Sequence, residues 1–229
     1  INEIPDLTER IQVSLFNIMQ ERDVQIKGYQ VRLPLDIFLV ATANPEDYTN
    51  RGRIITPLKD RYGAQIRTHY PENVNEELKI VLQEYKKFPD SEEKVSVPDF
   101  MAKIVGEITY LARNNPEINQ RSGVSLRVTI ANYESLVSAA FKRSIKSGQI
   151  THSKVSDLQE LIPSTVGKIE VETVEENQEI RIVKDLIDRA TLNVFSGIFS
   201  IEDFGNSIKA FEEGASITVG NSIKGSELL

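Results

Sequence analysis

The apolar run IFLVATA, residues 37–43, restricts the fold of this chain more than any other feature. Polar and apolar positions do not alternate in it, which is typical of a strand covered on both faces in a parallel sheet, and it ends at the turn signal Asn44-Pro45. A second short strand is expected at residues 64–71. Because two parallel strands cannot bury both of their faces, we expect an α/β core whose remaining strands precede Ile1.

Helical and hairpin patterns surround the expected strands. Apolar residues recur at helical spacing over residues 4–22 and again over residues 75–88. Between them, residues 24–33 alternate polar and apolar side chains around a Lys-Gly pair, which predicts a β-hairpin with a glycine turn. Together these elements predict that residues 1–90 form the second half of an α/β domain.

The rest of the chain is predicted to be largely helical. Residues 91–149 carry two apolar stripes at helical spacing and are expected to form an all-helical domain. Residues 150–229 are expected to form a mixed helical extension. Two apolar stripes are expected to lie in the core rather than to bind a cofactor, namely Ile104, Ile108 and Leu111, and Ile198, Phe199, Phe204 and Phe211.

The composition argues against several classes of protein. The 229 residues suffice for one large domain or two modest ones. With 27% charged residues and no long apolar window, we expect no membrane span. The net charge of -7 gives no help in binding a polyanion, so no nucleic-acid partner is expected. The absence of cysteine agrees with a cytoplasmic location, and His69 and His152 are too far apart for a compact metal motif.

Several polar residues stand where expected elements begin or end. The sequence contains no GxxxxGK[ST] loop and no GxGxxG loop, so it has no recognisable phosphate cradle. Glu3 precedes the first helix, Asn44 follows the apolar strand, and Arg61 and Arg127 each open a new element. Ligands of doubly wound sheets bind at the carboxyl ends of strands, so Asn44 is expected to reach a substrate or a water molecule.

Residues 2–48, NEIPDLTERI to ATANPEDY, together with the arginine-rich loop that leads to ITPLKDRYG, resemble the second half of an AAA+ ATPase core. Within that superfamily the chain is most similar to the branch of magnesium-chelatase ATPase subunits and MoxR-type proteins, in which a β-hairpin precedes the strand with the sensor asparagine. The resemblance covers residues 1–145 and has four features in order. It implies a partial P-loop parallel-sheet core with an inserted hairpin, followed by a helical lid.

Asn2 and Glu3 match the end of the Walker B motif, where the family usually has Asp-Glu. The resemblance implies that Glu3 polarises the water that attacks the γ-phosphate of ATP. Asn2 departs from the pattern, because a neutral amide can orient a water on Mg²⁺ but adds no charge, and it therefore implies weak metal binding. Taken alone, both residues could instead cap the helix that follows.

Asn44 and Arg61 match two further functional positions. Asn44 matches sensor 1, whose amide would hold the lytic water or the γ-phosphate, although a turn residue before proline is an equally good alternative. Arg61, in PLKDRYG, matches the arginine finger, which would reach the nucleotide of a neighbouring subunit. Arg51 and Arg53 are competing candidates, and an exposed loop arginine is usually solvated surface.

Arg127, in SGVSLRVTIANYESLV, resembles sensor 2, which would contact the γ-phosphate of its own subunit. Arg121 is the alternate candidate, and a surface arginine that begins a helix is the simpler alternative. The predicted hairpin could contact a partner or a neighbouring subunit, or be a solvated edge. Its candidate contact residues are Lys27, Gly28, Tyr29 and Arg32.

The resemblance implies an ATP hydrolase that uses ATP and Mg²⁺ in a homo-oligomeric ring, expected to be a hexamer. Such a ring would remodel a protein client or a von Willebrand-type partner subunit. Without a P-loop, the chain as given is expected to be inactive alone. The alternative is a non-catalytic interaction or regulatory module with a degenerate ATPase fold.

Overall fold

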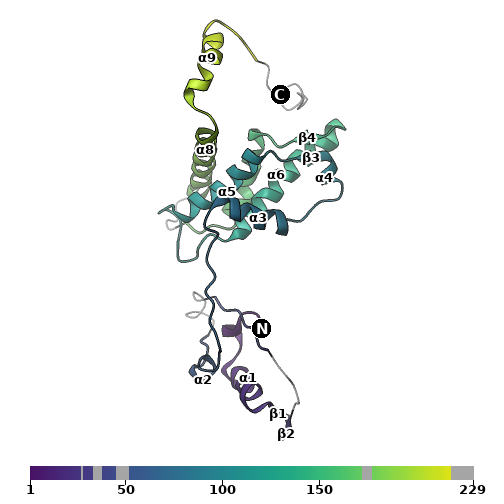
Figure 1. Ribbon diagram of the computed structural model, residues 1–229, viewed down its shortest axis with the longest axis vertical. Helices are drawn as coiled ribbons and strands as arrows, with labels where there is room; N and C mark the ends of the chain where they lie inside the picture. Colours follow the sequence, from purple (N-terminus) through teal and green to yellow (C-terminus); the bar gives the residue numbers. More distant parts are fainter. Residues whose placement is uncertain (27, 33–37, 45–51, 172–176, 218–229) are drawn as a thin grey trace. The chain divides into compact units, whose positions relative to one another are not determined.

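The computed structural model divides the chain into two compact units, Ile1–His69 and Tyr70–Leu229. It describes residues 1–26, 28–32, 38–44, 52–171 and 177–217, which are mostly helical with a few short strands (Figure 1). In these ranges, we find no helix with both the length and the apolar character needed to cross a bilayer. Each unit is described by itself.

The first unit combines short helices with one hairpin. Its elements are the 3₁₀ helix η1 (Ile4–Asp6), α1 (Glu9–Glu21), β1 (Asp23–Ile26), β2 (Tyr29–Arg32) and α2 (Thr56–Lys59). The predicted hairpin is confirmed, with Asp23 opposite Arg32 and Ile26 opposite Tyr29. Gly28, before β2, has a φ of 85°, which favours glycine at this position. Lys27 lies outside the described residues.

The helix expected over residues 4–22 is interrupted. After η1, Leu7 adopts an extended backbone with ψ 134°, and α1 begins only at Glu9. Helix α1 ends at Glu21, and the next residue, Arg22, has a left-handed φ of 53° that turns the chain into the hairpin. Among the described residues of this unit, the fully buried apolar side chains form a small cluster of Ile4, Ile54 and Leu58.

The two strands expected after the hairpin are not assigned in the part of the chain that the structure describes. Residues 38–44 make backbone hydrogen bonds with residues 1–4 but form no extended ladder. Residues 64–69 contain no strand, and Ile66 is 88% exposed. A strand forms only when a neighbour accepts its backbone hydrogen bonds, so an apolar pattern alone does not create one.

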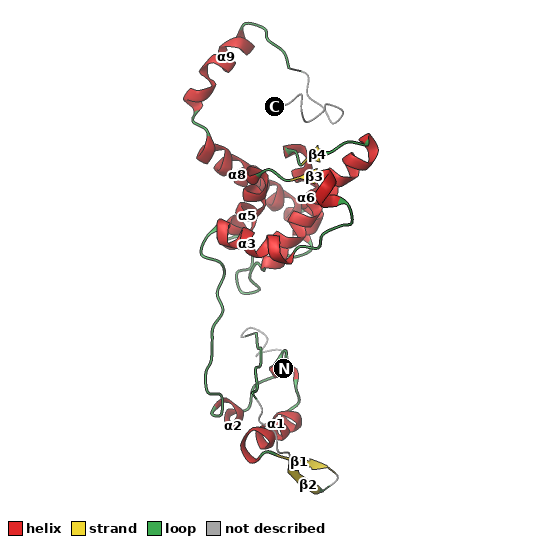
Figure 2. Cartoon of the chain, turned by 45° about the vertical axis from the view of Figure 1, so that its right-hand side comes forward, coloured by secondary structure: helices red, strands yellow, loops and turns green. Residues whose placement is uncertain are grey.

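The second unit is a helical bundle with one small parallel strand pair. Its elements are α3 (Val74–Glu84), α4 (Ser91–Lys94), β3 (Val95–Ser96), α5 (Asp99–Arg113), α6 (Leu126–Ser147), β4 (Thr151–His152), η3 (Val155–Leu161), α7 (Ile162–Val166), α8 (Gln178–Ile198), η4 (Ile201–Phe204) and α9 (Gly205–Glu212). Helix α5 packs against α3, α6 and α8 (Figure 2). The expected stripe on α5 is confirmed as core, with Ile104 and Ile108 buried and Leu111 packed against them.

The division between the units differs from the expected boundaries at residues 90 and 149. Helix α3, expected in the first domain, belongs to the second unit because Leu78 and Val81 are buried there. Helix α8, expected in a separate extension, packs along α5 in the same core. The expected all-helical region also contains β3, which pairs in parallel with β4.

The second apolar stripe expected in the core is largely exposed, so this prediction was wrong. Ile198, Phe199 and Phe211 are 50%, 45% and 52% exposed. The end of α8 and all of α9 extend beyond the packed helices, as Figure 2 shows, so no helix of the described residues covers their apolar faces. The rings of Phe195, Phe199 and Phe204 pack on one another instead, with centroids 5.2–5.5 Å apart.

Candidate functional site

Thr42 joins the start of the chain to the end of the apolar segment. Its hydroxyl donates to Asn2 Oδ1 at 2.6 Å and accepts from the backbone N–H of Glu3 at 3.0 Å. The backbone of Ile1 donates to Val40 and accepts from Thr42, at 2.6 and 2.9 Å. Ile1 thus bonds to Val40 and Thr42, the residues on either side of Ala41. In parallel strands each residue bonds in this way to the two neighbours of the residue opposite it. The two segments therefore run side by side in the same direction.

Glu3 has an unusual backbone at this junction. Its φ and ψ are 51° and 59°, the left-handed region that costs a residue other than glycine about 1–2 kcal/mol. The Glu3 side chain makes no capping hydrogen bond to η1, although it occupies the capping position. A capping hydrogen bond therefore does not account for this carboxylate, whereas the alternative of an acidic residue favoured by the helix start stays open. Asn2 likewise bonds to Thr42 rather than to the helix.

Asn44 lies two residues beyond Thr42, at the same end of the paired segments, and is exposed. The structure thus brings the candidate Walker B residues, Asn2 and Glu3, beside the segment that ends at the candidate sensor 1 residue. Since parallel neighbours end at the same edge, polar groups of both segments gather there.

A buried glutamine fixes the segment that leads to Arg61. Gln12 of α1 is 1% exposed and uses both ends of its amide. Its Nε2 donates to the carbonyls of Leu7 and Arg53 at 2.9 and 3.0 Å, and its Oε1 accepts from the N–H of Ile55 at 2.9 Å. These bonds tie the residues before α2 to α1.

Arg61 follows α2 and rests on α1. Its Nε donates to Gln20 Oε1 at 2.6 Å, its Nη1 donates to the carbonyl of Pro57 at 2.7 Å, and its guanidinium lies 4.0 Å from the centre of the Phe16 ring. These contacts use two of the five N–H groups of an arginine, so others remain for a ligand. Arg53, a competing candidate, is exposed, and Arg51 lies outside the described residues.

The predicted hairpin contacts are exposed. Tyr29 is 77% exposed, and Gly28 and Arg32 are also on the surface. This placement is compatible with a contact surface and with a solvated edge, so the two alternatives for the hairpin both stay open.

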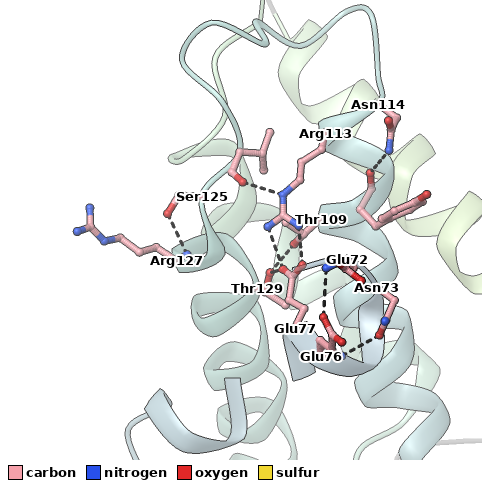
Figure 3. A network of polar contacts seen from close by, with 12 residues as sticks. Glu72, Asn73, Glu76, Glu77, Thr109, Arg113, Asn114, Ser125, Arg127 and Thr129 are labelled. Atoms are coloured by element: carbon pink, nitrogen blue, oxygen red, sulfur yellow. Dashed lines mark hydrogen bonds and ion pairs between the residues drawn. The ribbon is translucent and has the colours of Figure 1, made fainter. Parts of the chain in front are cut away.

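A buried polar network lies in the second unit, between α3, α5 and α6 (Figure 3). The guanidinium of Arg113 forms two hydrogen bonds with the Glu77 carboxylate, at 2.6 and 3.1 Å, and the side chains are only 9% and 2% exposed. The hydroxyl of Thr129 donates to the same carboxylate and lies 2.8 Å from the Thr109 hydroxyl. Arg113 Nε also donates to the carbonyl of Val124 at 3.0 Å.

Tyr70 covers this network. The guanidinium of Arg113 lies 4.2 Å from the centre of the Tyr70 ring, a cation–π contact. Gly123 permits the approach, because a Cβ atom there would lie 2.5 Å from the Tyr70 hydroxyl, and its φ of 68° also favours glycine.

Arg127 lies in the first turn of α6, next to this network but not part of it. Figure 3 shows its side chain pointing away from Glu77 and Arg113, and the residue is exposed. Ser125 caps the helix by accepting from the N–H of Arg127 at 3.1 Å. The alternate candidate, Arg121, is exposed in the preceding loop.

A groove of about 460 Å³ lies between η3 and α8. It is lined by Val155, Ser156, Leu158, Gln159, Ile187, Asp188, Thr191, Leu192 and Phe195. None of the predicted site residues lines it. Among the residues that the structure describes, no group of three or more His, Cys, Asp or Glu side chains could hold a metal ion.

Sequence reasoning missed three residues that organise these regions: Thr42, Gln12 and Glu77. Thr42 lies in an apolar run, and Gln12 and Glu77 lie on helices. Polar side chains at such positions are usually exposed to solvent. A weak signal existed for Thr42, because it interrupts the apolar run IFLVATA. Nothing in the sequence identified the partners of Gln12 or Glu77.

Comparison with known proteins finds a distant relative. The chain is 26% identical over 147 residues to a protein described as "Uncharacterized protein YeaC" from Bacillus subtilis (strain 168). The match covers 57% of this chain and 45% of that protein, so the chain spans less than half the length of the relative. No protein-family model matches the chain, and no solved structure matches it.

Proposed function

We propose that this chain is part of an AAA+ ATPase subunit that hydrolyses ATP in a homo-oligomeric ring to remodel a partner protein or complex. The observation that carries the proposal is the parallel contact between residues 1–4 and 40–42. It brings Asn2 and Glu3 to the edge where the segment with Asn44 ends, and ligands of α/β sheets bind at such edges. The left-handed backbone of Glu3 adds support, because strained residues cluster at functional sites.

In this proposal each candidate has one role. Glu3 polarises the attacking water and Asn44 holds that water or the γ-phosphate. Arg61 of a neighbouring subunit stabilises the charge that develops on the phosphate, with the N–H groups not used on Gln20 and Pro57. Arg127 contacts the γ-phosphate of its own subunit.

Asn2 is the candidate for contact with Mg²⁺. Its amide oxygen, the Thr42 hydroxyl and the Glu3 carboxylate are oxygen groups of the kind that Mg²⁺ prefers. Because Asn2 is neutral and its oxygen already accepts from Thr42, these residues fit a metal held through water and through ATP phosphates. When bound, Mg²⁺ would neutralise charge on the phosphates.

The rest of the proposal concerns the whole protein. We propose a cytoplasmic hexamer that acts on a protein client or a von Willebrand-type partner subunit, with no nucleic-acid partner. The net charge of -7 supports the last point. Metal insertion into a tetrapyrrole and chaperone activity are equally compatible, because a fold does not assign a substrate.

ATP hydrolysis by the full-length protein tests the proposal. We expect Glu3→Gln to lower kcat by about 100-fold or more while ATP binding persists, and Arg61→Ala to lower it by about 1000-fold. Glu9→Gln and Arg10→Ala, at exposed positions of α1, are the matched controls and should hydrolyse ATP like the parent.

Mixing the two inactive variants tests the ring. Subunits with Glu3→Gln supply an intact Arg61, and subunits with Arg61→Ala supply an intact Glu3, so mixed rings should regain part of the parental rate. Parental hydrolysis by both single variants would refute the site assignments.

The second candidate is a non-catalytic interaction module. The observation that favours it is the exposed apolar surface of α8 and α9, where Leu192 and Phe211 are 62% and 52% exposed. A full-length protein that binds no ATP but retains a specific protein partner would favour this module over the ATPase.

A further inference from the structure

The network of Figure 3 holds the chain on both sides of Arg127. Three residues before it, the carbonyl of Val124 accepts from Arg113 Nε at 3.0 Å. Two residues after it, the hydroxyl of Thr129 donates to the Glu77 carboxylate. Val124 and Thr129 are both 0% exposed, whereas Arg127 is exposed. The backbone is therefore fixed by buried contacts while the guanidinium stays free to meet a ligand.

These contacts come from outside α6. Glu77 lies on α3 and Arg113 lies near the end of α5, so the start of α6 is held by two other helices. A bidentate arginine–carboxylate pair fixes both distance and orientation, since two parallel hydrogen bonds constrain two planar groups. The first turn of a helix otherwise frays easily, because its N–H groups lack partners within the helix.

The same unit contains a second buried arginine–carboxylate pair, which can be compared with Arg113 and Glu77. Arg143, near the other end of α6, bonds to both oxygens of Asp157 and donates to the carbonyl of His152 at 2.7 Å. Its side chain and that of Asp157 are 15% and 7% exposed. The chemistry matches that of Arg113 and Glu77, but these contacts hold β4 and η3 and lie far along α6 from Arg127.

We propose that Glu77, Arg113 and Thr129 are positioning residues for Arg127. They fix the first turn of α6, so that less ordering of the Arg127 backbone is needed when this side chain contacts the γ-phosphate. The proposal rests on the proposed function, in which Arg127 contacts ATP.

The test compares Arg113→Lys with Arg143→Lys in the full-length protein. Both substitutions keep the charge and remove the planar fork. For Arg113→Lys we expect kcat/KM for ATP to fall about tenfold, and amide hydrogen exchange over residues 126–129 to accelerate about tenfold. For Arg143→Lys we expect both quantities to stay within about twofold of the parent.

A double variant separates positioning from general destabilisation. If Arg113 acts through Arg127, Arg113→Lys should have no further effect on kcat/KM once Arg127→Ala is present. Additive losses in the double variant would overturn the proposal. Should Arg113→Lys fail to fold, Thr129→Val takes its place, because it removes one anchor and leaves the ion pair intact.

The outcomes distinguish this inference from the proposed function. Parental activity and exchange in Arg113→Lys, with activity lost in Arg127→Ala, would overturn the positioning role alone. A full-length parent protein that does not hydrolyse ATP would overturn both. A loss of activity in Arg143→Lys equal to that in Arg113→Lys would show a structural role only and would also overturn the inference.

Discussion

The interiors of the two units are stabilised in different ways. In the second unit, α3, α5, α6 and α8 surround a continuous apolar core that includes Met101, Ile108 and Leu136, each 0% exposed. In the described part of the first unit, the buried apolar cluster is small, and three hydrogen bonds of the single Gln12 side chain tie its segments together. Apolar burial dominates in one unit, and specific polar contacts do in the other.

This difference bears on the candidate site. A fully buried apolar side chain contributes about 1.5–3 kcal/mol, so many such residues make the second unit tolerant of single polar changes at its surface. In its described residues, the first unit has fewer buried apolar side chains around Asn2, Glu3 and Arg61, and Phe38 is 91% exposed. We infer that function there is sensitive to a few polar groups.

The largest expected effect is on the core of the second unit. Leu136→Ala in α6 should lower the free energy of unfolding by about 2–5 kcal/mol, because it leaves a cavity at a site with no exposure. Thermal and urea unfolding followed by circular dichroism measure it, since most helical residues lie in this unit. Leu58→Ala, equally buried in the first unit, is the matched control and should leave that main transition unchanged. An equal shift from both variants would mean that the units unfold together.

A smaller effect is expected from the polar contacts of the first unit. Gln12→Ala would leave the carbonyls of Leu7 and Arg53 and the N–H of Ile55 without this partner, at a cost of about 2–3 kcal/mol. Hydrogen exchange at residues 53–58 should accelerate, whereas exchange in α5 should not change. Ser14→Ala, on the exposed face of α1, is the control. Unchanged exchange in Gln12→Ala would show that apolar contacts alone hold this segment.

Local patterns predicted the local elements of both units. The hairpin, α3, α5, α6 and α8 follow from periodicity and turn residues, which depend on neighbours in sequence. The strand expected at residues 64–71 was wrong, because a strand also depends on a partner that its own sequence does not specify. The prediction that the stripe from Ile198 to Phe211 lies in the core was wrong for a similar reason, because an apolar face is buried only if another element covers it.

The roles of Asn2, Glu3, Asn44, Arg61 and Arg127 stay predictions, and the sequence did not predict the contact between Asn2 and the Thr42 hydroxyl. Glu77 and Arg113 are 36 positions apart, and each alone is typical of a solvated helix surface. Such a pair can be recognised only in the folded structure, where tertiary packing removes both charges from water.

The smallest expected effect concerns Tyr133, which packs edge to face against Tyr85 with ring centroids 5.0 Å apart. Burial, with a contribution from Tyr85, raises the pKa of Tyr133 from 10.0 to about 12. The unfolded chain therefore loses this proton at lower pH than the folded chain. The contribution of Tyr133 to the free energy of unfolding is complete below pH 10 and disappears as the pH rises to about 12. At pH 11 the loss should be about 1.4 kcal/mol.

Urea unfolding at pH 9 and pH 11 measures this loss as a difference between the parent and Tyr133→Phe, which cancels the titration of lysines common to both. The parent should lose about 1.4 kcal/mol more than the variant over this range. Tyr110→Phe, at a residue of α5 that is 45% exposed, controls for the removal of a tyrosine hydroxyl from the surface. If parent and Tyr133→Phe lose equal stability, water must reach Tyr133, and the dense core that distinguishes the second unit does not extend to this ring.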